Sequence, residues 1–113
     1  MRQIEHTIRD ILETIARVES KIAGKSFQDF ESDWEFRFVL QRALEVVSEA
    51  TRRLPDELKA SRPEIRWRSI AAMGNILRHE YHTISDTVVW NAVHEEFPLL
   101  KAAINAIATR QPK

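Results

Sequence analysis

Residues 2–23 read RQIEHTIRDILETIARVESKIA, and their large aliphatic side chains recur every three or four positions. This spacing places the aliphatic residues along one side of a helix and most charged residues on the other. Gly24 follows directly, as glycine often does where a helix ends. The stretch therefore predicts a long amphipathic helix whose apolar face must pack against other parts of the chain.

Three more amphipathic patterns follow, and they predict helices over residues 33–53, 64–82 and 86–109. Short connectors join them, which favours an all-α fold, an antiparallel four-helix up-and-down bundle with a short extra helical turn in residues 55–64. The 113 residues fit a single domain spanning 1–113. A chain of this size often enlarges its buried area by forming a two-fold homodimer, so we expect a homodimer or a higher homo-oligomer.

Local signals refine this bundle. Phe27 and Phe30 are expected to anchor the first connector onto the core. Ser32 and Glu35 have the spacing of a capping box at the start of the second long helix. Pro98 lacks a backbone N–H and is expected to kink or interrupt the last helix.

Composition excludes several classes of protein. The chain has no cysteine, so disulfides and thiolate metal sites are ruled out. No apolar run approaches the roughly 18 residues that span a bilayer, and the first residues do not resemble a signal peptide. We therefore expect a cytoplasmic protein that does not bind membranes. Charge is uneven, with a net of −3 over residues 1–50 and +3 over residues 51–82. The basic part is suited to attract phosphate, although a solvated helical surface explains the same pattern.

Reactive side chains gather in the segment GNILRHEYH, residues 74–82, called the motif segment below. Its polar and ionisable members are Asn75, Arg78, His79, Glu80, Tyr81 and His82. Residues three and four apart share a helix face, so part of this set converges on one side. Gly74 is unusual inside a helix, where it costs about 1 kcal/mol relative to alanine. This cost suggests the close approach of another backbone or of a ligand, although simple tolerance is equally common.

The motif segment suits phosphodiester chemistry without a metal ion. RNA carries its own nucleophile, the 2′-hydroxyl, and His79 has a side chain able to act as a base near neutral pH. Arg78 is the candidate for stabilising negative charge on phosphate, with Asn75 as an orienting amide. His79 and His82 are three residues apart, but without a third ligand they make a poor metal site. We predict no metal site and no cofactor, and a polar surface cluster without catalysis remains the alternative.

Four segments resemble the HepT family, the toxins of HepT–MntA toxin–antitoxin pairs within the HEPN group of helical nucleases. They are DILETIARVESKIAGKSFQDF, LQRALEVVSEATRRLP, RPEIRWRSIAAMGNILRHEYHTI and VVWNAVHEEFPLLKAAI. Together they cover nearly the whole chain. The resemblance implies a HEPN-like bundle that dimerises with its motif helices near the interface.

The family motif is an arginine, four residues, a histidine, one residue and a tyrosine. His79 and Tyr81 match it, but the arginine position falls on Gly74. Arg78 follows Gly74 by one helical turn, and long helical side chains lean toward the N-terminus. One hypothesis is therefore that Arg78 lies over the space left open at Gly74 and replaces the missing cation.

The resemblance also implies a partner. In the family, the nucleotidyltransferase MntA silences the toxin by attaching AMP to the motif tyrosine, which here would be Tyr81, with Glu80 and His82 beside it. The leading interpretation is a HepT-like toxin that cleaves RNA. The alternative is a catalytically inactive, nucleotide- or partner-binding helical dimer that serves as the substrate of a nucleotidyltransferase, with Gly74 marking a lost active site.

Overall fold

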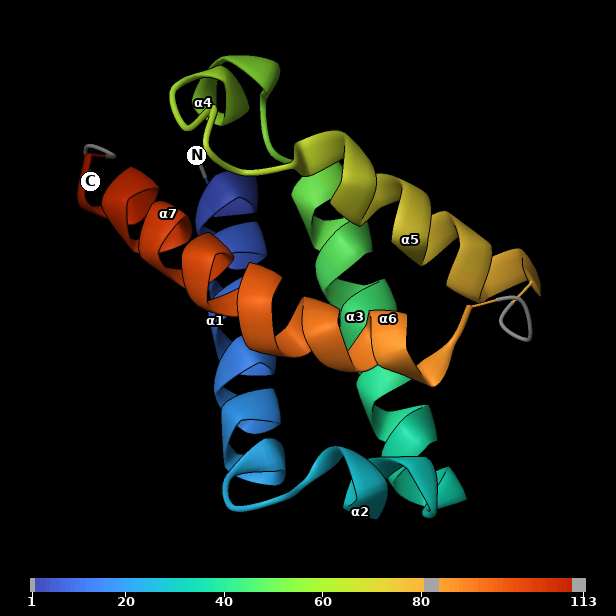
Figure 1. Ribbon diagram of the computed structural model, residues 1–113. Helices are drawn as coiled ribbons and strands as arrows, with labels where there is room; N and C mark the ends of the chain where they lie inside the picture. The colour runs from blue at the N-terminus through green and yellow to red at the C-terminus, as the bar shows by residue number, and fades with distance from the viewer. Residues whose placement is uncertain (1, 81–83, 111–113) are drawn as a thin grey trace.

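The computed structural model describes residues 2–80 and 84–110, and this part of the chain is helical and contains no strand (Figure 1). In chain order its elements are α1 (Arg2–Ile22), α2 (Phe27–Glu31), α3 (Trp34–Arg52), α4 (Asp56–Ala60), α5 (Trp67–Glu80), α6 (Asp86–Asn91), the π-helical turn η2 (Ala92–Glu96) and α7 (Phe97–Arg110). The predicted all-α class is confirmed, and the short extra helical turn predicted within residues 55–64 is α4.

Helix α3 is the centre of the arrangement. It runs antiparallel to α1, and the continuous run from α6 to α7 lies across both helices (Figure 1). Helix α5 packs mainly on α3, at the edge of the molecule. The side of α5 opposite α3 is therefore turned away from the core.

Aliphatic side chains from α1, α3, α5 and the C-terminal helices fill the core, as the periodicity of residues 2–23 predicts. Its largest fully buried members are Phe30, Phe97, Ile11, Ile15, Leu40, Leu44, Leu100, Ile104 and Ile107. None of the helices in residues 2–80 and 84–110 combines the length and apolar character needed to cross a membrane.

An aromatic cluster closes the end of the bundle below α1. The buried Phe30 ring stacks on Trp90, with 5.2 Å between centroids, and meets Phe36 edge-on at 5.4 Å. Phe27 contacts both Phe30 and Trp90. The predicted anchoring by Phe27 and Phe30 is confirmed, and their segment is itself a short helix, α2.

The capping box predicted at Ser32 and Glu35 is wrong. Asp33 is the N-cap of α3, and its carboxylate accepts hydrogen bonds from the backbone N–H groups of Glu35 and Phe36. Ser32 is engaged by the preceding helix, because its hydroxyl donates to the Gln28 carbonyl at 2.9 Å. A capping box does occur six residues earlier, between Ser26 and Asp29.

The Ser26–Asp29 box makes a testable contribution at low pH. The Ser26 backbone N–H donates to the Asp29 carboxylate at 2.9 Å and, with the Ser26 hydroxyl, holds the pKa of Asp29 below its usual value. A carboxylate with a lowered pKa stabilises the fold above the unfolded-state pKa of about 3.9 and loses that effect as pH falls. We expect Asp29→Asn to melt earlier than wild type at pH 7, and the difference to shrink toward pH 3. Thermal unfolding followed by circular dichroism measures it, with the exposed Glu31→Gln as control. A difference that stays constant with pH would contradict the assignment.

The interruption predicted at Pro98 is present as a π-helical turn just before it. The Phe97 N–H donates to the Ala92 carbonyl, five residues back, where an α-helix would bond four residues back. Pro98 has no N–H, and in a regular helix its ring would collide with the carbonyl of His94. The wider turn relieves this collision, so α6 and α7 continue as one bent path.

Candidate functional site

Helix α5 carries the described part of the motif segment, and its start is fixed by Trp67. The Trp67 indole N–H donates to the carbonyls of Lys59 at 3.0 Å and Arg62 at 3.1 Å. The predicted helix over residues 64–82 begins at Trp67, because the residues before it form turns. Ile70 and Leu77 are buried and hold α5 on the core.

Gly74 lies where α5 crosses α3. A Cβ atom built at Gly74 would lie 2.0 Å from Ser48 Oγ and 2.3 Å from Ser48 Cβ. The Ser48 hydroxyl donates to the Ala71 carbonyl of α5 at 3.4 Å, which ties the two helices at the same point. The close approach suggested by Gly74 is therefore an approach of α3. The position of the family's motif arginine faces the α3–α5 contact in this chain.

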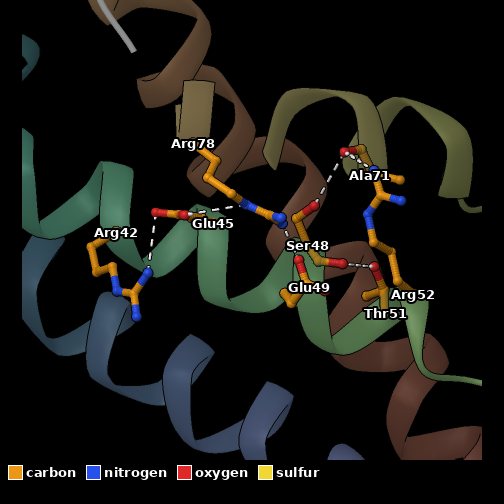
Figure 2. A network of polar contacts seen from close by, with 8 residues as sticks. All are labelled: Arg42, Glu45, Ser48, Glu49, Thr51, Arg52, Ala71 and Arg78. Carbon is orange, nitrogen blue, oxygen red and sulfur yellow. Dashed lines mark hydrogen bonds and ion pairs between the residues drawn. The ribbon is translucent and has the colours of Figure 1, made fainter. Parts of the chain in front are cut away.

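The Arg78 guanidinium is held by carboxylates of α3. Figure 2 shows it reaching toward Glu49, with which it forms an ion pair, and toward Glu45, whose Oε2 lies 3.7 Å from Arg78 Nε. Glu45 also pairs with Arg42 at 3.2 Å. Because Arg78 and Glu49 are each about two-fifths exposed, solvent screens this pair and its contribution to stability is at most about 1 kcal/mol.

The position of the Arg78 side chain differs from the hypothesis based on the sequence, which placed it over an open space beside Gly74. The volume beside Gly74 is filled by Ser48, while Arg78 lies in a surface hollow of about 390 Å³ between α3 and α5. The residues lining this hollow are Arg42, Glu45, Val46, Glu49, Arg53 and Arg78. Any phosphate bound by Arg78 must therefore compete with two carboxylates.

Asn75 and His79 occupy the other side of α5. They are four residues apart and both are exposed, so they share the helix face turned away from α3. Successive residues of an α-helix are about 100° apart around the axis, so His79 projects from α5 about 100° around from Arg78. Glu80 is exposed at the end of α5, and Tyr81 and His82 lie outside the described residues.

A second hollow, of about 600 Å³, lies where α4 leads into α5. Its ionisable lining residues are Asp56, Lys59, Arg66 and Arg68. Lys59 pairs with Asp56 at 3.8 Å, and Arg66 and Arg68 form no ion pair with another residue in 2–80 or 84–110. The hollow therefore keeps an excess of positive charge.

Sequence reasoning missed the acidic and hydroxyl residues of α3 around the motif helix. Glu45, Ser48 and Glu49 are 23 to 33 residues from their partners on α5. The spacing of Glu45 and Glu49, one helical turn apart, was a usable signal only once α3 and α5 were known to pack together.

The comparison with protein families identifies the family of the chain. The family model described as "Ribonuclease HepT-like" matches residues 11–107. The chain belongs to the HepT-like ribonuclease family. That match spans the motif segment and all the long helices except the first turns of α1 and the end of α7.

Individual HepT-like relatives agree with this assignment. A protein of Thermococcus cleftensis named "Probable ribonuclease HepT" is 37% identical over 94 residues, which cover 83% of this chain and 86% of that protein. One of Caldanaerobacter subterraneus subsp. tengcongensis named "Putative RNase TTE0752" is 30% identical over 108 residues, covering 96% and 93% respectively. No solved structure gives a significant match. The resemblance to the HepT family is confirmed.

In residues 2–80 and 84–110, no group of three or more metal-ligating side chains is placed to hold an ion. His82, one member of the weak two-histidine alternative, lies outside these ranges. The candidate site that the structure describes is therefore a set of polar and cationic groups on two sides of α5.

Proposed function

We propose that this HepT-like protein is the toxin component of a toxin–antitoxin pair and cleaves RNA without a metal ion. The supporting observation is the exposed His79 on a helix that lies within the family match. In the proposed reaction, His79 removes the proton of a 2′-hydroxyl, the 2′-oxygen bonds to the adjacent phosphorus, and the bond from phosphorus to the 5′-oxygen breaks. A 2′,3′-cyclic phosphate remains on one fragment, and the leaving 5′-oxygen takes up a proton from water to become a hydroxyl. The 2′-hydroxyl as nucleophile makes RNA the substrate. RNA and an intracellular antitoxin fit a cytoplasmic protein.

Asn75 and Arg78 have supporting roles in this proposal. Asn75 shares the exposed face with His79 and orients the phosphate or the imidazole through its amide. Arg78 donates to phosphate after exchanging one of its two carboxylate partners. Because Glu49 is about two-fifths exposed, exchanging this partner for a phosphate has a small cost.

We further propose that the working form is a homodimer. A histidine on the outward side of an edge helix has solvent around it, whereas ligand sites are usually concave and exclude much of the water. A second copy of the chain packed against the outer side of α5 would enclose His79 and form a concave site. The partly exposed Ile76 on this side also favours burial.

Silencing is proposed to occur at Tyr81. A MntA-like nucleotidyltransferase would attach AMP to its hydroxyl, between Glu80 and His82, and the added phosphate would place negative charge and bulk beside the RNA site. Since Glu80 is exposed at the end of α5, a second enzyme has access to this end of the helix.

The alternative is a catalytically inactive helical dimer that binds a nucleotide or a partner and serves as substrate for the same transferase. One observation favours it: Gly74 occupies the position of the motif arginine and is committed to the contact with Ser48. Both functions allow AMP on Tyr81, so only cleavage separates them.

Cleavage of a defined single-stranded RNA in EDTA tests the proposal. We expect wild type to cleave, and His79→Ala to lose on the order of 10²–10⁴-fold in rate, as for removal of an acid–base group. Arg78→Ala is expected to lose less, because the Arg78 charge is shared with two carboxylates. The protein is first checked by mass for AMP on Tyr81. No cleavage by unmodified wild type would select the inactive dimer.

A further inference from the structure

The outward stripe of α5, defined as Arg68, Ala72, Asn75 and His79, is spaced symmetrically about its own centre. All four residues are exposed. The steps between them are four, three and four residues, so they follow a single helix face. The midpoint of Ala72 and Asn75 is also the midpoint of Arg68 and His79. A second α5 laid antiparallel across this midpoint therefore places Ala72 opposite Asn75 and Arg68 opposite His79, twice.

Side-chain size and charge fit this pairing. Ala72 and Asn75 are small enough at the centre to let two helices approach closely. The first turn of α5 has no acidic residue and lies at the positive end of the helix dipole, whereas the last turn lies at the negative end. That last turn also carries Arg78, whose charge is balanced by Glu45 and Glu49, and His79. Antiparallel pairing brings the positive end of each helix dipole to the negative end of the other. A second copy of this chain is therefore the occupant that the stripe fits.

The same antiparallel pairing brings an arginine of one subunit close to His79 of the other, where the motif arginine is missing. Within one chain, Arg68 and His79 are eleven residues apart, which is about 16 Å along a helix and too far to act on one phosphate. We propose that Arg68 supplies the missing cation in trans, binding the phosphate that the partner subunit's His79 attacks through the 2′-hydroxyl. This inference rests on the proposed ribonuclease function and homodimer.

The electrostatics of the two candidate cations favour Arg68. Arg78 is held by Glu45 and Glu49 on the α3 side of α5. Arg68 has no ion-pair partner in the described ranges and lies on the hollow with excess positive charge where α4 leads into α5. Its full charge is therefore open to a phosphate, and the partner's His79 would lie at the mouth of that hollow.

A heterodimer experiment tests the assignment in trans. Subunits carrying Arg68→Gln and His79→Ala are co-expressed with two different tags and purified through both. Each homodimer is expected to be nearly inactive. The heterodimer has one intact composite site, formed by His79 of the first subunit and Arg68 of the second, and is expected to recover about half the wild-type activity under two-fold symmetry.

Three controls accompany it. Arg17→Gln removes an exposed arginine of α1 that contributes to neither hollow described above, and it should cleave like wild type. A heterodimer of Arg78→Gln with His79→Ala shows whether Arg78 also acts across the interface. Sedimentation of each variant confirms that it is dimeric, and a monomeric but active wild type would refute the inference.

The remaining outcomes separate the inference from the function. Wild-type cleavage with no recovery in the Arg68→Gln/His79→Ala heterodimer overturns the role in trans and leaves the ribonuclease in place. Full activity of the Arg68→Gln homodimer overturns it as well. A wild type that does not cleave RNA removes the proposed function, and the role of Arg68 in cleavage falls with it.

Discussion

Gly74→Arg, which restores the arginine of the family motif, is expected to destabilise the protein by more than about 3 kcal/mol, at or beyond the upper end of overpacking effects. The reason is the crossing of α3 and α5, where even a Cβ atom at this position would lie 2.0 Å from Ser48 Oγ. Accommodating a guanidinium requires the two helices to separate. We therefore expect the substitution to impair folding and to give no gain in RNA cleavage.

Smaller substitutions at the same crossing isolate the cause. Gly74→Ala should cost about 1–2 kcal/mol, since the overlap with Ser48 outweighs the roughly 1 kcal/mol that alanine gains over glycine in a helix. Adding Ser48→Gly removes the atoms that collide, so the double variant should be more stable than the sum of the two single changes predicts. Urea unfolding measures both quantities.

Ser69→Arg is the matched control, because Ser69 is an exposed residue of the same helix. It should change the free energy of unfolding by less than about 0.5 kcal/mol. If Gly74→Arg were as stable as Ser69→Arg, the close α3–α5 contact would be wrong.

Phe30→Ala is expected to lower the free energy of unfolding by about 3–5 kcal/mol, the range for removing a buried phenylalanine. Phe30 is fully buried and contacts the rings of Phe27, Phe36 and Trp90. Removing the Phe30 ring leaves a cavity. It also removes the edge-on contact with Phe36, through which α2 meets α3 in this cluster. Since α2 also packs on α6, the closed end of the bundle should loosen as a unit.

The control for Phe30 is Phe38, whose side chain is 52% exposed and packs edge-on against Trp34. Phe38→Ala should cost about 1 kcal/mol or less, the size of a surface aromatic pair. Chemical unfolding of both variants under the same conditions gives the comparison. Equal losses would mean that the aromatic cluster does not stabilise the fold as its burial indicates.

The helices were predictable from the sequence because their signals are local. The periodicity of residues 2–23, Gly24 and Pro98 each act within a few positions, and α1, the positive φ of Gly24 and η2 follow them. Capping was less predictable, since Ser32 and Asp33 are both good N-cap residues. The choice of Asp33 depends on where α2 ends. The sequence pattern predicts a connector in place of α2, so it gives no end for this helix.

The candidate site was only partly predictable, because its contacts join distant segments. The exposed face shared by Asn75 and His79 follows from helical spacing alone. The pairing of Arg78 with Glu45 and Glu49 depends on the angle and register of α3 against α5, which no local pattern encodes. The same holds for Ser48, whose contact gives Gly74 its physical reason.

The π-helical turn at Ala92–Glu96 has a consequence for how insertions and deletions are tolerated. Such a turn holds one residue more than an α-helical turn, so the apolar side chains before and after it follow two helical phases about 100° apart. Deleting one residue there would merge the phases, turning Val89 and Trp90 relative to Leu100 and Ile104. The extra residue therefore rotates the apolar face of α7 relative to that of α6. Relatives that align without gaps through this turn are expected to share the bent path of α6 and α7.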